Sequence, residues 1–325
     1  MTSPQRPDRP GLTDVARRAG VSVATASRAL SGAGPVSAAA RREVLAAAGE
    51  LGYRPHPVAR SLARGGGTRI VLAFRDARAS ILEDPFVARA TAAVATVADT
   101  CGLGVSLRRL PLDGRAALDE LAADRGVAAV VLAGHDRSAL PAALHGRVAT
   151  IGAAVPGVAR ADVDSAAGVG ALAGHLYATG RRRIALVRGP RWLAAARAPL
   201  DAYVSVMRAA GLPARIVPGD FTARRGRAAA SEILRRWPDT DAIVAVTDAT
   251  ALGVLQFLAA RGVRVPADIA LTGFDDIPLA AAVCPALSTA THPVEEVAAA
   301  AARAALSGRA DDSVFPSRPV LRESA

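Results

Sequence analysis

The chain has 325 residues and a formal net charge of +11, with 40 basic and 29 acidic residues. A chain of this length exceeds one small core, so we expect a small domain and a larger body. No apolar run reaches the ~18 residues of a membrane span, and the polar start lacks an apolar export segment, which favours a cytoplasmic protein without membrane contact. Two isolated cysteines, Cys101 and Cys284, indicate core thiols, and no metal or cofactor motif is present.

Residues 12–52 predict three short helices. The first spans 12–19 and ends at Gly20, and the second spans 23–30 after Ser22, which can cap it by accepting a backbone N–H. The third follows Ser37 and ends at Gly52, and we expect its apolar stripe to contain Val44, Leu45, Ala48 and Leu51.

Two short helices joined by a tight turn are typical of a helix-turn-helix, which places its second helix in the major groove. We expect DNA contacts from the cap and the exposed face of that helix, namely Ser22, Val23, Ala24, Thr25, Ser27 and Arg28. An ordinary three-helix bundle is the alternative. Residues 1–64 hold ten arginines against four acidic residues, so this fifth of the chain carries +6 of the net charge of +11. That concentration favours the DNA-binding interpretation.

The segments "DVARRAGVSVATASRAL", "VSAAARREVLAAAGELGYRP" and "VARSLA" together resemble the DNA-binding head and hinge of the LacI/GalR transcriptional regulators. The resemblance implies a head over 1–53, a hinge helix and linker over 54–67, and an effector-binding and dimerisation domain over 68–325. In that family, paired hinge helices enter the minor groove. Leu62 then matches the leucine that wedges between base pairs, Ala59 packs beside it, and His56 stands where the family usually has Asn.

From Arg69 onward, short β-rich runs alternate with amphipathic stretches, which is the pattern of a parallel sheet with crossover helices. The pattern restarts after a helix near 169–178, so we predict two doubly wound lobes. The family resemblance implies the same α/β body, like periplasmic sugar-binding proteins, with three crossings between the lobes. It also implies that a helix over about 294–306 completes the first lobe.

Ligands of such sheets bind beyond the carboxyl ends of the strands. There the resemblance assigns effector binding to Arg197, Phe221 and Asp275, with Thr247 where the family usually has Asn and Asp164 as a weaker candidate. Each has a structural alternative, because Asp275 can cap a turn, Arg197 can form a surface ion pair, and Phe221 can belong to the core.

The sequence therefore predicts a homodimeric transcriptional repressor. It would bind a pseudo-palindromic operator in double-stranded DNA under the control of a small-molecule effector, a sugar or sugar derivative. A co-repressor type of regulator that senses a nucleobase or other metabolite is the alternative. An enzyme is disfavoured, because the short Gly-x-Gly fragments complete no dinucleotide fingerprint and the histidines form no catalytic pattern. An exported binding protein would need a signal segment and no basic head.

Overall fold

The computed structural model describes residues 11–31, 35–53, 67–136 and 138–325. The chain separates into two compact units, Met1–Thr68 and Arg69–Ala325, which are treated one at a time below. Within the described ranges, no helix is both long enough and apolar enough to cross a bilayer.

The first unit is helical. Its elements are α1 (Leu12–Arg18), α2 (Val23–Ser31) and α3 (Ala38–Glu50). Gly20 and Gly52 have positive φ angles of 63° and 62°, a conformation that glycine adopts without steric cost, and they follow α1 and α3 as the sequence predicts. Small side chains from all three helices form the core: Val15, Ala16, Ala26, Ala29, Val44, Ala47 and Ala48.

Leu45 does not lie where the sequence places it. Its side chain is 53% exposed, whereas Val44 is fully buried. Consecutive residues of an α-helix point about 100° apart, so the core stripe of α3 runs through Val44, Ala47, Ala48 and Leu51 and passes Leu45 by. The prediction that Leu45 belongs to the apolar stripe was wrong, and Ala47 lies in the core instead.

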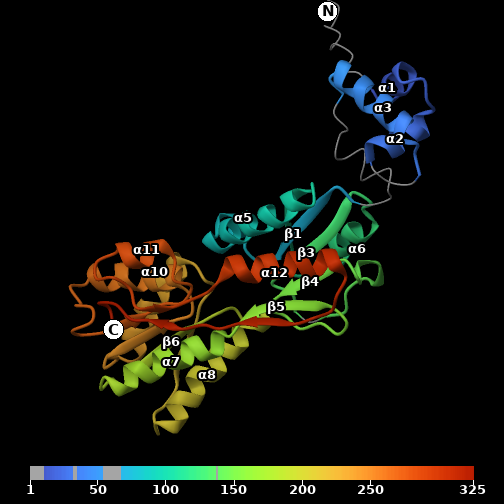
Figure 1. Cartoon of the computed structure of the whole chain (residues 1–325). Coiled ribbons are helices and arrows are strands. Elements are labelled where there is room, and N and C mark those ends of the chain that lie inside the picture. Colours follow the sequence, from blue (N-terminus) through green and yellow to red (C-terminus); the bar gives the residue numbers. More distant parts are fainter. Residues whose placement is uncertain (1–10, 32–34, 54–66, 137) are drawn as a thin grey trace, which may run out of the picture. The chain divides into compact units, whose positions relative to one another are not determined.

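The second unit begins with a six-stranded parallel sheet in the order β11-β5-β4-β3-β1-β2 (Figure 1). Its strands are β1 (Arg69–Arg75), β2 (Gly104–Leu110), β3 (Val127–Ala133), β4 (Val148–Ile151), β5 (Ala159–Val163) and β11 (Ser313–Phe315). Its helices are α5 (Pro85–Thr100), α6 (Arg115–Ala123) and α12 (Val294–Ser307), with short 3₁₀ turns η1 (Ala79–Glu83) and η2 (Ala142–Leu144). The sequence did not predict β4 and β5.

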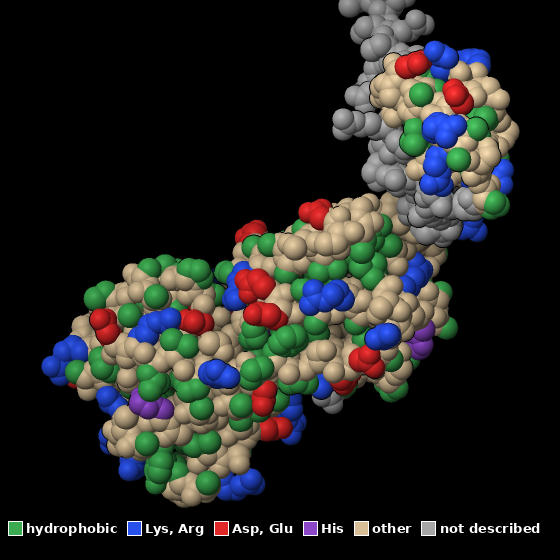
Figure 2. Space-filling model, in the orientation of Figure 1, with side chains coloured by type: hydrophobic (Ala, Val, Ile, Leu, Met, Phe, Trp, Pro, Cys, Tyr) green, Lys and Arg blue, Asp and Glu red, His purple; other side chains and the backbone are tan. Residues whose placement is uncertain are grey.

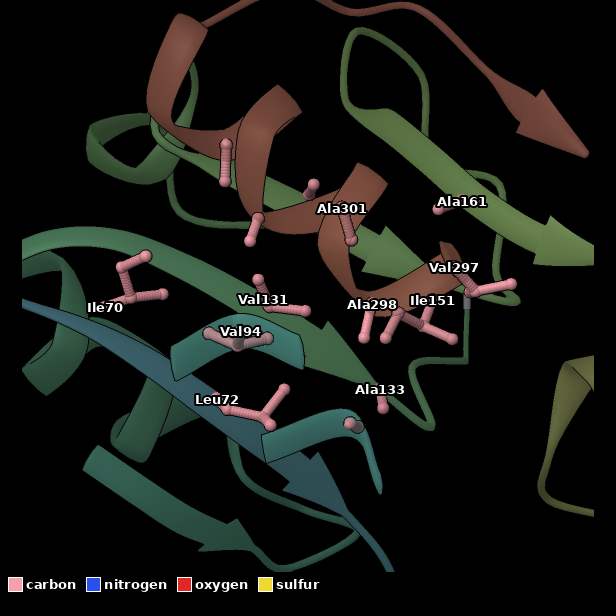
Figure 3. Packing of buried hydrophobic residues seen from close by; sticks show 14 of the residues in the cluster. Ile70, Leu72, Val94, Val131, Ala133, Ile151, Ala161, Val297, Ala298 and Ala301 are labelled. Carbon is pink, nitrogen blue, oxygen red and sulfur yellow. The ribbon is translucent and has the colours of Figure 1, made fainter. Parts of the chain in front are cut away.

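Alternate residues of β1 enter two different cores. Ile70 and Leu72 lie under α5 and α12, a packing that Figure 3 shows, whereas Val71 and Ala73 face α6 on the opposite side. Both faces of the sheet are thus covered, as an all-parallel sheet requires. The helix predicted near 294–306 does complete this lobe, because α12 packs against α5, β3, β4 and β5.

A four-stranded parallel sheet of order β7-β6-β8-β9 forms the second lobe. Its strands are β6 (Ile184–Arg188), β7 (Arg215–Pro218), β8 (Ala242–Ala245) and β9 (Ala270–Thr272). The helices α7 (Ser165–Ala178) and α8 (Arg197–Ala209) cover one face, and α9 (Ala223–Arg236) and α10 (Asp248–Ala259) cover the other. Short elements η3 (Ala194–Ala196) and α11 (Pro278–Ala282) complete it.

The chain crosses between the lobes three times, as the resemblance implies. It leaves the first lobe between β5 and α7, returns between β10 (Thr289–Ala290) and α12, and leaves again between β11 and β12 (Pro319–Val320). β10 and β12 pair antiparallel, and the C-terminus lies beside the second lobe (Figure 1). The predicted fold class, a helical head with a two-lobed α/β body, is confirmed.

Candidate functional site

The helix α2 presents a small exposed face. Oγ of Ser22 accepts a hydrogen bond of 3.1 Å from the backbone N–H of Thr25, which is the cap that the sequence predicts. Ala26 and Ala29 are buried with core residues of α1 and α3, and this packing determines which face of α2 is exposed. Val23 is 45% exposed, and Ala24 and Arg28 are exposed as well.

Arg28 is held close to its own helix. Its Nε donates a hydrogen bond of 3.2 Å to the carbonyl oxygen of Ala24, so the guanidinium lies along the exposed face of α2. Such a planar fork is the group that reads a guanine edge in the major groove. The predicted hinge contacts of His56, Ala59 and Leu62 lie outside the described residues.

The α/β unit contains a cavity of about 200 Å³ at the carboxyl ends of strands from both sheets. Residues that end or follow β1, β3, β4 and β5 line it from the first lobe, and residues that follow β6, β7, β8 and β9 line it from the second. This is the position at which open parallel sheets bind their ligands.

Aromatic side chains gather in this cavity. The whole chain has only six phenylalanines and two tryptophans. Four of those phenylalanines and one tryptophan line the cavity, namely Phe74, Phe86, Phe221, Phe274 and Trp192. A concentration this high gives the cavity flat apolar walls against which a ring can stack.

Strained backbone marks the same place. Phe221 has a φ of 71° and Asp275 a φ of 115°, in the left-handed region that non-glycine residues rarely adopt, and both line the cavity. The Phe221 ring lies so close to Gly189 that a Cβ on Gly189 would stand 2.8 Å from it. Strain of this kind persists where the surrounding structure fixes it, and it clusters at ligand sites.

Asp275 and His292 form a pair on the cavity wall. Nδ1 of His292 lies 2.9 Å from Oδ1 of Asp275, and its ring stacks on Phe86 with centroids 5.6 Å apart. Burial raises the pKa of the Asp275 carboxyl above its ordinary value, and the contact with His292 opposes that shift. The contact with His292 therefore fixes the Asp275 carboxyl group on the cavity wall.

Asp248 fixes the loop that carries Asp275. Its Oδ1 accepts a hydrogen bond of 2.6 Å from the hydroxyl of Thr289, and its Oδ2 accepts one of 2.9 Å from the backbone N–H of Ile277. Its own N–H donates to the carbonyl of Phe274 at 2.6 Å. Burial raises the pKa of Asp248 to about 7. The carboxyl group that holds this loop is therefore shielded from water.

Arg78 also lines the cavity, where it lies between two carboxylates. Its Nη2 lies 2.9 Å from Oδ2 of Asp76 and its Nη1 lies 3.3 Å from Oδ2 of Asp84. Asp84 also caps α5 by accepting from the N–H of Phe86 at 3.1 Å. The arginine is thereby fixed in place before any ligand arrives.

Comparison with known proteins decides the family. Residues 11–56 match the profile of bacterial regulatory proteins of the lacI family, and residues 173–324 match a periplasmic binding protein-like domain. The regulator CelR of Thermobifida fusca is 31% identical over 98% of this chain and 97% of its own length. The chain belongs to the LacI family.

Solved structures of LacI-family regulators are also similar in fold. A complex of CelR with cellobiose has a TM-score of 0.71 at 30% identity, covering 98% of this chain and all of that one. A lac repressor dimer bound to operator and an anti-inducer has a TM-score of 0.82 at 26% identity, covering 98% and 99%. The relatives are DNA-binding regulators, so the expectation of a regulator rather than an enzyme is confirmed.

In this LacI-family chain the structure brings three of the five predicted effector residues together. Phe221, Thr247 and Asp275 line the cavity. Thr247 also caps α10, since its hydroxyl accepts from the N–H of Thr250 at 3.2 Å. The positive φ and the contact with His292 give Asp275 a role beyond that of a turn cap.

The other two predicted residues do not line the cavity. Asp164 is exposed and caps α7 by accepting from the N–H of Ala167 at 3.0 Å. The Arg197 side chain is 75% exposed and pairs with Asp201 of its own helix at 2.8 Å, which is the surface ion pair named above as its alternative.

Sequence reasoning missed several residues of the site. Asp76 and Arg78 follow β1 directly, so the rule of inspecting strand ends could have found them. Asp162 lies in β5, a strand that the sequence did not predict. The only sequence signal for β5 is the alternation of small apolar and charged residues over five positions. His292 has no sequence signal, because the parallel bridge between Asp275 and Thr291 brings it to the site.

Proposed function

We propose that this LacI-family chain is a homodimeric repressor whose hold on a pseudo-palindromic operator is controlled by a sugar bound in the cavity. One observation carries the proposal, namely the aromatic cavity with the Asp275–His292 pair at the strand ends of both lobes. Aromatic walls stack on the apolar face of a sugar ring, and carboxylates accept from its hydroxyls.

The relatives support the same choice of effector and assembly. CelR was solved with cellobiose, and the lac repressor was solved as a dimer on its operator. A dimer would present two heads to two half-sites, and the basic head would supply the phosphate contacts. On the visible face of the α/β unit, charges of both signs are scattered, as Figure 2 shows. Such a protein acts in the cytoplasm, where its operator lies.

The decisive experiment measures operator binding with and without sugar. Sites are first selected from random duplexes with the purified full-length chain, and the best site is then titrated at fixed salt. We expect a two-fold symmetric site whose affinity falls when cellobiose is added, by roughly 5- to 150-fold for a coupling of ~1 to 3 kcal/mol. A site without symmetry would overturn the dimer, and affinity that rises with ligand would indicate a co-repressor.

A thermal-shift screen identifies the sugar in parallel. A ligand at 100 times its Kd stabilises the folded chain by about 2.7 kcal/mol, which shifts the unfolding midpoint measurably. The matched control is Asp275→Asn, which keeps the size of the side chain and removes its charge. We expect this variant to unfold like the parent without ligand and to lose the shift. A panel of sugars that leaves the parent chain unchanged would contradict the proposed effector class.

A further inference from the structure

Among the described residues, Asp162 is the one cavity carboxylate that has neither an arginine nor a histidine within ion-pair distance. Asp76 and Asp84 are paired with Arg78, and Asp275 is paired with His292. The Oδ1 atom of Asp162 accepts a hydrogen bond of 2.8 Å from the N–H of Val163, and no salt bridge from the described part of the chain reaches this carboxylate.

The side chains of Arg160 and His292, which lie near Asp162, contact other carboxylates. Nε of Arg160 lies 3.4 Å from Oδ2 of Asp312, and Nδ1 of His292 faces Asp275. Burial raises the pKa of Asp162, and the hydrogen bond from the N–H of Val163 and the charge of Arg160 offset that shift only in part. An unpaired carboxylate is costly to bury, and a positive charge brought by a ligand would reduce that cost.

Asp162 lines the cavity and is only partly buried, so its side chain faces the space that a ligand would occupy. Gly152 lies beside it with a φ of 88°, and a Cβ at Gly152 would stand 3.0 Å from Cβ of Ala195 and 4.0 Å from Oδ1 of Asp162. A side chain at Gly152 would therefore crowd this part of the cavity wall.

The charge of the described cavity wall has the opposite sign to that of the whole chain. Four carboxyl groups line the cavity, those of Asp76, Asp84, Asp162 and Asp275, against two guanidiniums, those of Arg75 and Arg78, and one imidazole, that of His292. The chain as a whole carries +11. Aromatic rings beside carboxylates favour a cation, because the ring faces are negative as well.

Resting on the proposed function, we propose that Asp162 selects an amino sugar, whose protonated amine it binds while the sugar ring stacks on the aromatic wall. Asp275 and Arg78 remain for hydroxyl groups of the same ligand. Nη1 of Arg75 is buried and has no acceptor in the described structure.

The test compares three β-1,4-linked disaccharides of matched ring geometry: cellobiose, the glucosamine disaccharide and its N,N′-diacetyl derivative. Calorimetry uses the full-length chain near neutral pH, below the pKa of the sugar amines. We expect the cationic disaccharide to bind roughly 10- to 100-fold more tightly than cellobiose, as a charge-assisted hydrogen bond implies. Equal or weaker binding of the cationic sugar would overturn the proposal.

Two variants assign the preference to Asp162. Asp162→Asn keeps an oxygen for the N–H of Val163, so we expect it to fold, to bind cellobiose like the parent and to lose the preference for the amine. Asp119→Asn is the matched control, because it removes the same charge from an exposed position on α6. A preference that persists in Asp162→Asn contradicts the role of this residue.

Two further outcomes separate this proposal from the proposed function. If neutral sugars bind and alter operator affinity but the amine adds nothing, only the role of Asp162 fails. If an acid analogue such as cellobionic acid binds best, the amino-sugar class is wrong. If no sugar of any charge binds, the proposed sugar effector fails together with this inference.

Discussion

At the scale of single residues, Arg28 is the side chain expected to read sequence. It lies exposed on α2 with its Nε bonded to the carbonyl of Ala24. We predict that Arg28→Ala costs ~1 to 3 kcal/mol on the best operator and relaxes specificity at one base position of each half-site. A base-by-base binding scan at fixed salt measures both effects. Arg208→Ala, the same charge loss on an exposed position of α8, is the control. Loss of equal size on every DNA sequence would contradict base reading.

The buried carboxyl of Asp248 predicts a pH dependence of stability. Its pKa is raised from an ordinary 3.8 to about 7 in the folded chain, chiefly by burial. Between about pH 4 and pH 7 the folded state therefore holds a proton that the unfolded state has lost, so the contribution of Asp248 to stability falls as the pH rises. At about 1.4 kcal/mol per pKa unit, the loss is at most about 4 kcal/mol.

Asp248→Asn isolates this effect. The amide can accept from the N–H of Ile277 and donate to the hydroxyl of Thr289, so both contacts can persist. Urea unfolding of parent and variant across that pH range should show the parent losing stability relative to the variant as the pH rises. Parallel pH profiles would show that the carboxyl titrates near its ordinary value.

At the scale of elements, two glycines set how closely α9 and α10 approach. A Cβ on Gly253 would stand 1.9 Å from the carbonyl oxygen of Ala223, and one on Gly226 would stand 2.1 Å from that of Thr250. We predict that Gly253→Ala destabilises the α/β unit by about 3 kcal/mol, because the new methyl group would clash with a backbone carbonyl, which cannot change rotamer as a side chain can.

Gly174→Ala is the matched control for the substitution at the contact between α9 and α10. Gly174 lies within α7, and no described neighbour stands within 4 Å of the position that a Cβ would occupy there, so the same substitution should stabilise the helix by up to about 1 kcal/mol. Denaturant midpoints of the two variants should move in opposite directions. If Gly253→Ala left the stability unchanged, α9 and α10 could move apart without destabilising the α/β unit, and the prediction would be wrong.

Elements with strong periodicity were predictable, and short ones were not. The β1 and β3 segments are runs of apolar residues buried on both faces, and α5 and α12 carry clear apolar stripes. β4 has only four residues and β5 alternates small apolar with charged residues, so neither stands out from a loop. Asp162 was missed for that reason.

The effector residues assigned from the family resemblance show a second limit of prediction from sequence. Phe221 and Asp275 line the cavity, and each lies in the short loop after a strand, since β7 ends at Pro218 and β9 at Thr272, so their position depends on the sheet. Arg197 instead begins α8, where its side chain pairs with Asp201 one turn later. Spacing along the chain predicts where a backbone lies better than where a long side chain points.

At the scale of the whole molecule, regulation requires the two compact units to influence each other. The segment that matches the lacI-family profile belongs to the first unit, and the cavity belongs to the second. Neither unit alone can respond to sugar by releasing DNA. The proposed regulation is therefore a coupling free energy between two distinct sites on one chain.

Such a coupling must be reciprocal. If sugar weakens operator binding by a given factor, a saturating operator duplex must weaken sugar binding by the same factor, which we expect to lie at roughly 5- to 150-fold. Calorimetric titration of the sugar into the full-length chain, with and without the selected duplex, measures the second factor. A duplex of unrelated sequence at the same concentration is the control. Sugar affinity that is unchanged by the operator would show that the cavity does not control DNA binding, whatever it binds.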